Sequence, residues 1–271
     1  MQYVENKRYS LGTIIVPCSS LSRFAAFWMS LETLYVPTGT RLIVQMGADI
    51  PHQLNEGIRQ MVGEWVWILG DDHTFDPLTL LKLLDRQVDI VMPVVPRRDP
   101  PYKPVLVHGP LSRNMRLYEW TDLPVEGLFQ LPKNDPAGQA CMLIRRPVLG
   151  RLGDPWFEGG KLVPGRLMED MYFVQRLHDL NIPIWIDCDL SVGHIANITI
   201  VPQKYNGRWW AGYKYNGHPI LWQDVTIAEA PAENSTESVK PLFDPRLATA
   251  VHKKHELETW EQEAESDTTP T

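Results

Sequence analysis

The chain has 271 residues, which is enough for one large domain or two small ones. An apolar fraction of 44% and 10 Trp can build a substantial core, and a net charge of -7 excludes an overall basic surface for a nucleic acid. Three cysteines, Cys18, Cys141 and Cys188, lie far apart in apolar contexts, which predicts reduced core thiols in a cytoplasmic protein. We expect neither a secretion signal nor a membrane span, because no run of about 18 apolar residues occurs.

Strand and helix patterns alternate from the start of the chain to about residue 92. Short apolar runs predict strands at 12–16, 42–44, 65–69 and 89–92, and apolar residues at helical spacing predict helices at 21–35, 51–62 and 77–86. Such alternation indicates crossover units. We therefore expect an α/β fold with a mostly parallel central sheet and flanking helices.

Prolines and short strands are typical of the segment from residue 93 onward. Strands are expected at 105–108, 115–120, 139–145 and 182–186, and a helix at 169–180. Tyr and Trp then crowd around two Asn-Gly turn signals, before a linker at 229–238, an amphipathic helix at 247–263 and a polar tail. We therefore divide the chain into a domain at 1–203 and a C-terminal extension at 204–271.

The segment Gly70-Asp71-Asp72-His73 directly follows the predicted strand at 65–69. Ligands of open α/β sheets bind outside the carboxyl ends of strands, so these carboxylates and this imidazole are candidate metal ligands. Such donors suit Mg²⁺ or Mn²⁺, ions that often hold a substrate phosphate. A helix-initiating turn is the alternative, but Asp76-Pro77 already provides the cap and first residue of the next helix.

Two later segments carry further candidate residues. Glu169-Asp170 opens a predicted helix, where carboxylates are also favoured merely because they stabilise the helix dipole. His194 leaves a predicted strand, and a lone histidine in that position usually has a structural role. Taken singly, each segment therefore keeps its structural alternative.

The order and spacing of these pieces are more specific than any one of them. From about residue 12 to 201 the chain resembles the GT-A glycosyltransferases, particularly the family-two-like enzymes of phages and bacteria. The resemblance rests on a first strand ending in Pro17, Leu54-Asn55-Glu56-Gly57, Asp71-Asp72-His73 in place of an Asp-x-Asp motif, Pro100-Pro101-Tyr102-Lys103-Pro104, the stretch from Gly138 to Arg146, Glu169-Asp170 and Gly193-His194-Ile195.

The resemblance implies a GT-A fold and a role for each matching residue. A divalent ion, Mn²⁺ or Mg²⁺, would be held by Asp72, His73 and His194 and would bridge the diphosphate of a nucleotide sugar. Asp170 matches the catalytic base of inverting members, with Glu169 as its neighbour. Donor-binding positions are Pro17, Ser19, Asn55, Asp71, Arg97, Gly138 and Gln139. The metal register stays open, because either Asp72 is the main ligand or Asp71 and His73 bind in an Asp-x-His pattern similar to polypeptide N-acetylgalactosaminyltransferases.

The expected function is metal-dependent transfer of a sugar from a UDP- or GDP-sugar to an acceptor hydroxyl, with inversion. A divalent ion stabilises the charge on the leaving diphosphate, and a carboxylate takes the proton of the attacking hydroxyl. Arg97 and Arg98 follow a predicted strand end, where they meet either phosphate or solvent.

The acceptor is either a hypermodified base in phage DNA or a protein or glycan. The aromatic and basic segment 205–222 suits nucleobase stacking, whereas the acidic net charge counts against DNA. If the chain is viral, its expected location is the host cytoplasm.

Two other classes of function compete with this hypothesis. A metal-dependent nucleotidyltransferase or phosphohydrolase also gathers carboxylates at strand ends, but such enzymes often begin with a glycine-rich phosphate loop, and Val16-Pro17-Cys18-Ser19-Ser20 contains no glycine. A non-catalytic nucleotide-sugar-binding module is the second rival. The presence of Glu169-Asp170 and His194 argues against it.

Overall fold

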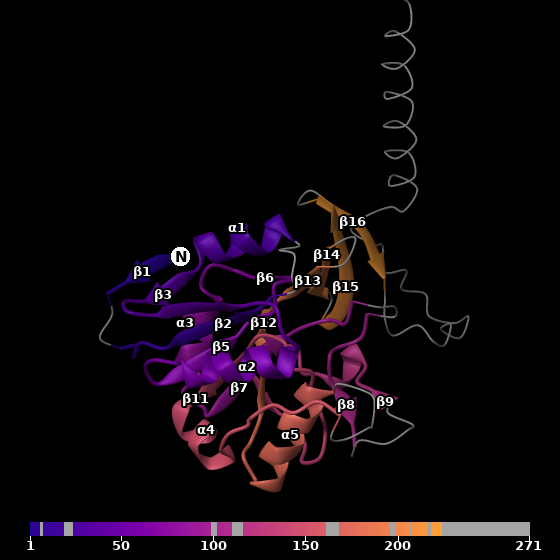
Figure 1. The fold of residues 1–271 in the computed structure, drawn as a ribbon. Coiled ribbons are helices and arrows are strands. Elements are labelled where there is room, and N and C mark those ends of the chain that lie inside the picture. Colours follow the sequence, from indigo (N-terminus) through magenta and orange to yellow (C-terminus); the bar gives the residue numbers. More distant parts are fainter. Residues whose placement is uncertain are drawn as a thin grey trace, which may run out of the picture.

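Figure 1 shows the computed structural model, which describes residues 1–5, 8–18, 24–98, 102–109, 116–160, 168–195, 199–205, 207–215 and 218–223. The fold is mixed α/β, with a central seven-stranded sheet, a five-stranded sheet and two two-stranded sheets. Ser19, the expected linker at 229–238 and the expected helix at 247–263 lie outside the described residues.

The central sheet has the strand order β10-β12-β7-β11-β5-β2-β4. Its strands are β2 (Thr13–Pro17), β4 (Arg41–Gln45), β5 (Trp65–Ile68), β7 (Ile90–Val94), β10 (Leu128–Gln130), β11 (Met142–Arg145) and β12 (Trp185–Ser191). Neighbours are parallel in the pairs β2·β4, β2·β5 and β7·β12, and antiparallel in β5·β11, β7·β11 and β10·β12. Strands β2, β4, β5, β7 and β12 thus share one direction, which β10 and β11 oppose.

The sheet is therefore mixed, and the expected parallel arrangement applies only to the set of five strands that share a direction. No helix lies between β7 and β11 except the three-residue 3₁₀ helix η1 (Trp120–Asp122), within the described part of that segment. Parallel neighbours need a crossover that carries the chain back to the other edge of the sheet. Because none occurs here, β11 starts from the edge where β7 ended and runs antiparallel to it.

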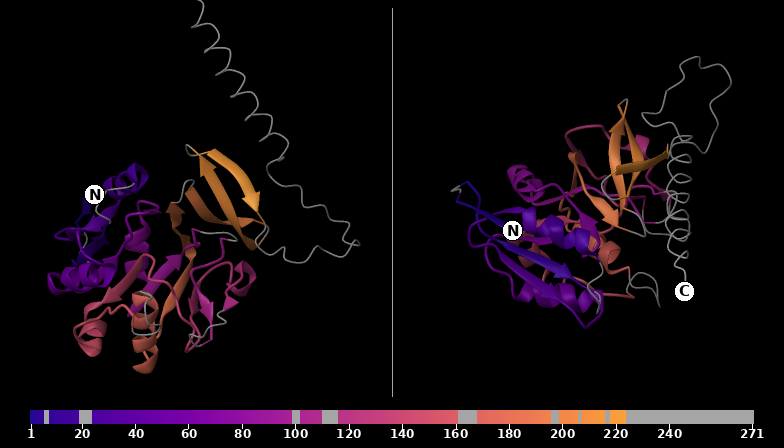
Figure 2. Two further views of the ribbon diagram at one scale, coloured as in Figure 1. Left: turned by 45° about the vertical axis from the view of Figure 1, so that its right-hand side comes forward. Right: turned by 90° about the horizontal axis from the view of Figure 1, so that it is seen from above.

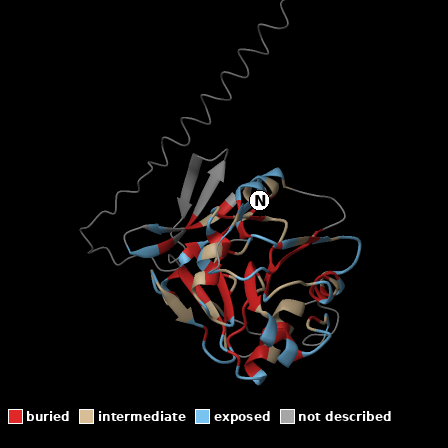
Figure 3. Cartoon of the chain, turned by 90° about the vertical axis from the view of Figure 1, so that its left-hand side faces the viewer, coloured by how far each residue is buried: buried red, intermediate tan, exposed pale blue. Residues whose placement is uncertain are grey.

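Burial explains why the central strands read as nearly continuous apolar runs. Every residue of β5 and β7 is buried, and β2 is buried except at Pro17. Strands covered on both faces have this composition, and Figure 3 shows them as the red centre of the molecule. All three cysteines are free and buried, as the sequence predicted.

Helices flank this sheet (Figure 1). The helices are α1 (Ala25–Thr33), α2 (Ile50–Arg59), α3 (Thr79–Asp85), α4 (Arg146–Leu152) and α5 (Glu169–Asp179). Helix α2 packs against β2 and β4. It begins where the Asp49 carboxylate accepts a hydrogen bond of 3.0 Å from the His52 amide, with Pro51 in the first turn. Within the described residues, no helix combines the length and apolar character that crossing a membrane requires.

The second sheet joins the site region to the start of the expected C-terminal extension. It has the order β16-β15-β14-β13-β6, with β6 (His73–Thr74), β13 (Gly193–Ile195), β14 (Thr199–Tyr205), β15 (Arg208–Tyr215) and β16 (His218–Gln223). Figure 2 shows β14–β16, in orange, beside the central sheet. The expected boundary after residue 203 falls inside β14.

Strand β15 contributes to the core of the protein. Trp209 and Ala211 are 2% and 0% exposed and belong to the main hydrophobic cluster. Part of the segment 205–222 is therefore core and not only a surface for an acceptor. Two pairs of short strands complete the fold. Strand β1 (Gln2–Val4) pairs in parallel with β3 (Tyr35–Pro37). Strand β8 (Val107–His108) pairs antiparallel with β9 (Arg116–Leu117).

Candidate functional site

The candidate site lies where the strand order of the central sheet reverses. From β2 the chain passes first to β4 on one side of β2 and then to β5 on the other. Such a reversal leaves a crevice at the carboxyl ends of the two central strands, which is where open α/β sheets bind ligands. Here the ends are Pro17-Cys18 after β2 and Gly70-Asp71-Asp72 after β5.

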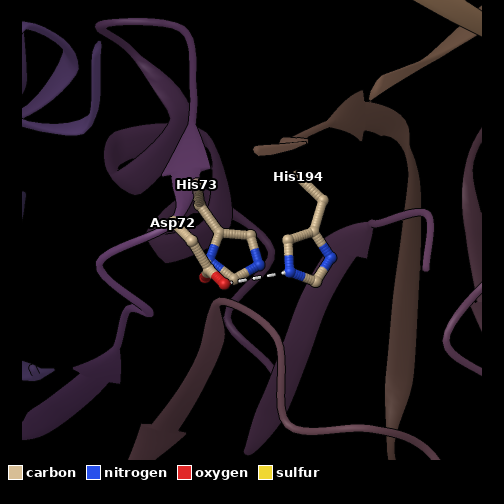
Figure 4. A group of neighbouring side chains, drawn as sticks. All are labelled: Asp72, His73 and His194. Atoms are coloured by element: carbon tan, nitrogen blue, oxygen red, sulfur yellow. Dashed lines mark hydrogen bonds and ion pairs between the residues drawn. The ribbon is translucent and has the colours of Figure 1, made fainter. Parts of the chain in front are cut away.

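Two imidazoles meet at this edge because β6 and β13 pair in antiparallel register. His73 lies directly opposite His194, and the two rings stack with centroids 4.6 Å apart and planes 22° apart. The amide of Ile195 donates a hydrogen bond of 2.7 Å to the Asp72 carbonyl, which continues the ladder. Figure 4 shows the two rings next to each other, with the Asp72 carboxylate beside them.

The alternation of strand residues gives this small ladder two different faces. Thr74 and Gly193, the neighbours of the two histidines, form the adjacent ladder pair, and the side chain of Thr74 is on the face away from the imidazoles. They help to line a cavity of about 660 Å³, together with Asp76, Asp189 and Lys204. The imidazole pair and this cavity therefore lie on opposite faces of the same two strands.

Asp72 is the centre of the charged contacts. Its Oδ1 lies 3.1 Å from Nδ1 of His73, and its Oδ2 lies 3.3 Å from Nε2 of His194 and 3.0 Å from Nη1 of Arg98. Burial acts to raise the pKa of the Asp72 carboxyl, but the hydrogen bonds and charges of His194 and His73 outweigh it and hold the pKa well below its usual range. Asp72 is therefore ionised at neutral pH.

Hydrogen bonds to the main chain decide which nitrogen of each imidazole faces the site. Nδ1 of His194 lies 2.9 Å from the carbonyl oxygen of Pro96, and Nδ1 of His73 lies 3.2 Å from that of Gly70. A carbonyl oxygen only accepts, so Nδ1 carries a hydrogen in both rings. The lone pair of each neutral ring is then on Nε2, the pattern found in metal-ligating histidines.

The Nε2 atom of His73 lacks the hydrogen-bond partner that a purely structural role would give it. This atom is buried and has no such partner among the described residues. Nε2 of His194 faces an ionised carboxylate oxygen of Asp72 at 3.3 Å. Two lone pairs in contact are favourable only when a proton or a cation lies between them. A divalent cation would satisfy all three groups together.

The residues present fit a metal ion. Asp72, His73 and His194 each offer one ligand atom, and these atoms lie within 4.8 Å of one another. They are the three residues for which the sequence predicted this role. Two imidazoles and one carboxylate suit Mn²⁺, which accepts nitrogen ligands more readily, better than Mg²⁺, which prefers oxygen ligands.

Asp71 lies outside this cluster, which favours the alternative with Asp72 as the main ligand over the pattern of Asp71 with His73. Burial and then the Asp71 charge raise the pKa of the Cys18 thiol to about 11, which places Asp71 near the end of β2.

Gly70 makes the cluster possible because it lacks a side chain. A Cβ on this residue would lie 2.7 Å from Nδ1 of His73 and 2.9 Å from Oδ1 of Asp72. Both distances are shorter than van der Waals contact. A side chain at position 70 would therefore force His73 or Asp72 to move.

The predicted catalytic carboxylates lie at the same edge, at the start of α5. The Asp170 carboxylate accepts hydrogen bonds from the amide of Met171, at 2.7 Å, and from the amide of Gln139. A Cβ on Gly138 would lie 3.5 Å from Oδ2 of Asp170, so the carboxylate packs against this glycine. The structure thus brings together Asp170, Gly138 and Gln139.

Strand pairing links this group to the metal-ligand cluster. Gly138 and Gln139 precede β11, whose first residue Met142 lies opposite Ile68 at the end of β5. Burial and then the charge of Asp72 raise the pKa of Cys141 well above its usual value, so Asp72 lies within electrostatic reach of this segment. Nε2 of Gln139 is buried and makes no hydrogen bond within the described part of the chain.

The acidity of the two carboxyls differs from the expectation based on helix position. The start of a helix favours the ionised form, but burial outweighs this effect and raises the pKa of Asp170. Burial also raises the pKa of Glu169, with smaller contributions from the charges of Asp170 and Asp49. A carboxyl whose pKa is raised towards neutrality is a stronger base once ionised.

The remaining residues predicted to bind the donor differ in their position and contacts. Pro17 ends β2 at the site edge. Asn55 is buried, and its amide holds the main chain of Trp156 and Phe157 through three hydrogen bonds, so its observed contacts are structural. Arg98, rather than its neighbour Arg97, contacts Asp72. The sequence contains no signal that distinguishes two adjacent arginines.

No protein-family model matches the chain, and no curated protein matches it. Among solved structures it is similar to the STIV protein A197, with a TM-score of 0.42 and 12% identity over 74% of this chain and 90% of that one. It is also similar to residues 1–349 of S. aureus TarS (TM-score 0.39, 13% identity, 70% and 58% covered). The inositol-1-phosphate CTP transferase of T. maritima is similar at 0.38 and 12% identity, with 65% and 84% covered. Likenesses of this strength identify neither an activity nor a ligand.

Proposed function

We propose that the protein is a metal-dependent glycosyltransferase that moves a sugar from a UDP- or GDP-sugar to an acceptor hydroxyl with inversion. One observation carries the proposal. Two imidazoles with main-chain-bound Nδ1 atoms and one ionised carboxylate converge at the carboxyl edge of the sheet, where its strand order reverses. Such an edge is a nucleotide-binding position in α/β folds, and such a ligand set holds a divalent ion beside phosphates.

The ligands would be Asp72, His73 and His194, and the ion proposed is Mn²⁺. When bound, the ion stabilises the negative charge of the leaving nucleoside diphosphate. The chain contributes the orientation of the ligands, because the carbonyls of Pro96 and Gly70 hold the two rings. Fixed ligands need no reorganisation during the reaction, which is the advantage of a preformed site.

Asp170 is proposed as the general base that takes the proton from the acceptor hydroxyl. Its carboxylate lies at the same sheet edge and is held by the amides of Met171 and Gln139. Glu169 precedes it by one residue and therefore points about 100° away around the helix. Glu169→Gln is accordingly the matched control for Asp170→Asn.

The acceptor is proposed only as a hydroxyl compound. A hypermodified base in phage DNA is one candidate, and a protein or glycan is the other. Trp209 is buried in the core, with Nζ of Lys204 5.1 Å from its ring centroid, so this aromatic residue is no free platform for a base.

Mass spectrometry of reactions with a panel of nucleotide sugars tests the function. Each donor is offered with a DNA containing 5-hydroxymethylated bases and with a glycan mixture, in Mn²⁺ or in chelator. We expect sugar transfer and release of a nucleoside diphosphate in Mn²⁺ alone. Release of pyrophosphate instead would identify a nucleotidyltransferase, and transfer in chelator would refute the metal requirement.

Substitutions connect the activity to the site. Asp72→Asn removes a negatively charged ligand and should abolish metal-dependent transfer. Asp89→Asn is the matched control, because Asp89 is exposed and precedes β7 at the opposite edge of the sheet. Equal activity of the two variants would exclude the proposed centre.

A further inference from the structure

Arg98 places a positive charge on the carboxylate oxygen that faces His194. Its Nη1 lies 3.0 Å from Oδ2 of Asp72, and Nε2 of His194 lies 3.3 Å from the same atom. Within the described residues, Arg98 is the permanently charged group in contact with Asp72. The guanidinium thus occupies a position in which it neutralises a carboxylate that is only 15% exposed.

The two partners differ in how firmly they are held. The side chain of Arg98 is 46% exposed, so its charged end reaches solvent, whereas Asp72 sits among buried groups. The amide of Arg97 donates a hydrogen bond of 2.8 Å to the Lys103 carbonyl, which anchors the backbone beside Arg98. The Arg98 side chain can therefore leave Asp72 by rotation of its own bonds, without a change in the backbone.

We propose that Arg98 is an exchangeable counter-ion of the metal site. It neutralises Asp72 while no divalent ion is bound, gives up Oδ2 when the ion binds, and then pairs with the diphosphate of the nucleotide. The inference rests on the proposed metal site and adds to it a role for Arg98, which is to exchange between Asp72 and the diphosphate. It makes Arg98 a positioning residue for metal and donor.

Electrostatics gives the exchange its direction. A guanidinium and a divalent cation on one carboxylate oxygen repel each other, so binding of the ion expels Arg98. A diphosphate beside the ion offers oxygens with the geometry that a guanidinium binds in a bidentate manner. Arg98 therefore opposes binding of the metal alone and favours binding of the metal together with a diphosphate.

Electron paramagnetic resonance of free Mn²⁺ measures the first effect. We expect Arg98→Gln to bind Mn²⁺ about two- to fivefold more tightly than the wild type, the range that an exposed ion pair contributes. Arg98→Lys keeps the charge and should remain close to the wild type. Arg41→Gln is the matched control and should leave the affinity unchanged, because Arg41 is exposed and begins β4 at the opposite edge of the sheet. The difference should shrink at high salt because exposed charges are screened.

Calorimetry with UDP and with GDP at saturating Mn²⁺ measures the second effect. Here Arg98→Gln should bind the diphosphate severalfold more weakly than the wild type, which is the opposite sign. Thermal melting of each variant checks that the fold is retained. An Arg98→Gln protein that binds Mn²⁺ no more tightly than the wild type, or binds the diphosphates equally well, overturns the exchange.

The design separates this inference from the proposed function. If neither the wild type nor Arg98→Gln binds Mn²⁺, the metal site and the exchange fail together. If both bind Mn²⁺ with equal affinity, the metal site stands and the exchange alone fails.

Discussion

Replacing Asn55 by alanine removes a buried amide that makes three hydrogen bonds to one loop. Its Nδ2 donates to the Phe157 carbonyl at 2.8 Å, and its Oδ1 accepts from the amides of Trp156 and Phe157 at 3.0 Å each. Each bond contributes about 0.5–1.5 kcal/mol net, and its loss leaves main-chain groups unpaired. We expect the free energy of unfolding to fall by about 2–4 kcal/mol, which lowers the melting temperature by about 5–15 °C in a domain of this size.

Urea denaturation followed by tryptophan fluorescence measures this loss. His52→Ala is the control, because His52 is exposed on the same helix and should change the free energy of unfolding by less than about 0.5 kcal/mol. Asn55→Asp keeps the acceptor oxygen and loses the donor, so its effect should be intermediate. Below the unfolding transition, UDP binding by Asn55→Ala should match the wild type. Wild-type stability combined with lost UDP binding would refute the structural role and assign Asn55 to the donor site.

Three further outcomes are expected. Asp170→Asn should slow transfer by about 10²–10⁴-fold with nearly unchanged UDP affinity, as loss of a general base does. Burial raises the pKa of Asp170, so its basic form should be lost, and kcat/KM should fall, at a pH above the usual carboxyl pKa of about 3.9. A fall of kcat/KM only at or below pH ~3.9 would contradict this. Arg86→Ala removes the bidentate partner of Asp187, which is 0% exposed, and should lower the free energy of unfolding in urea by about 3–5 kcal/mol; a loss below about 1 kcal/mol would contradict it. Trp209→Ala should cost about 3–5 kcal/mol in the same assay, whereas exposed Arg208→Ala should cost little; equal effects would remove Trp209 from the core.

Local sequence patterns predicted the elements that deliver side chains to the site edge. The predicted strand at 65–69 is β5 (Trp65–Ile68), and the predicted helix at 169–180 is α5 (Glu169–Asp179). Both succeed because burial on both faces of a strand, or on one face of a helix, leaves a direct periodic pattern. Helix α4 (Arg146–Leu152) was missed because Pro147 and Gly150 weaken the helical signal in so short a segment.

The contacts that complete the site were beyond such patterns. Strands β6 and β13 have two and three residues, too few for a periodic pattern, and they pair across a long sequence separation. The matching of His73 with His194 was inferred from a resemblance to a family rather than from periodicity. The direction of the Arg98 side chain depends on the backbone conformation after β7. Two adjacent arginines in a sequence do not indicate which of them will face the site.

The brevity of the β6–β13 ladder makes the chain sensitive to length changes at this point. Side chains alternate between the two faces of a strand, so a single inserted or deleted residue just before His194 would turn its ring from the His73 side to the side of Thr74 and the cavity. Strand β14 continues from the same ladder and would carry the shift into the rest of the sheet. Natural variants of this protein should therefore differ in length in other loops and keep a constant spacing from Val192 to Ile195.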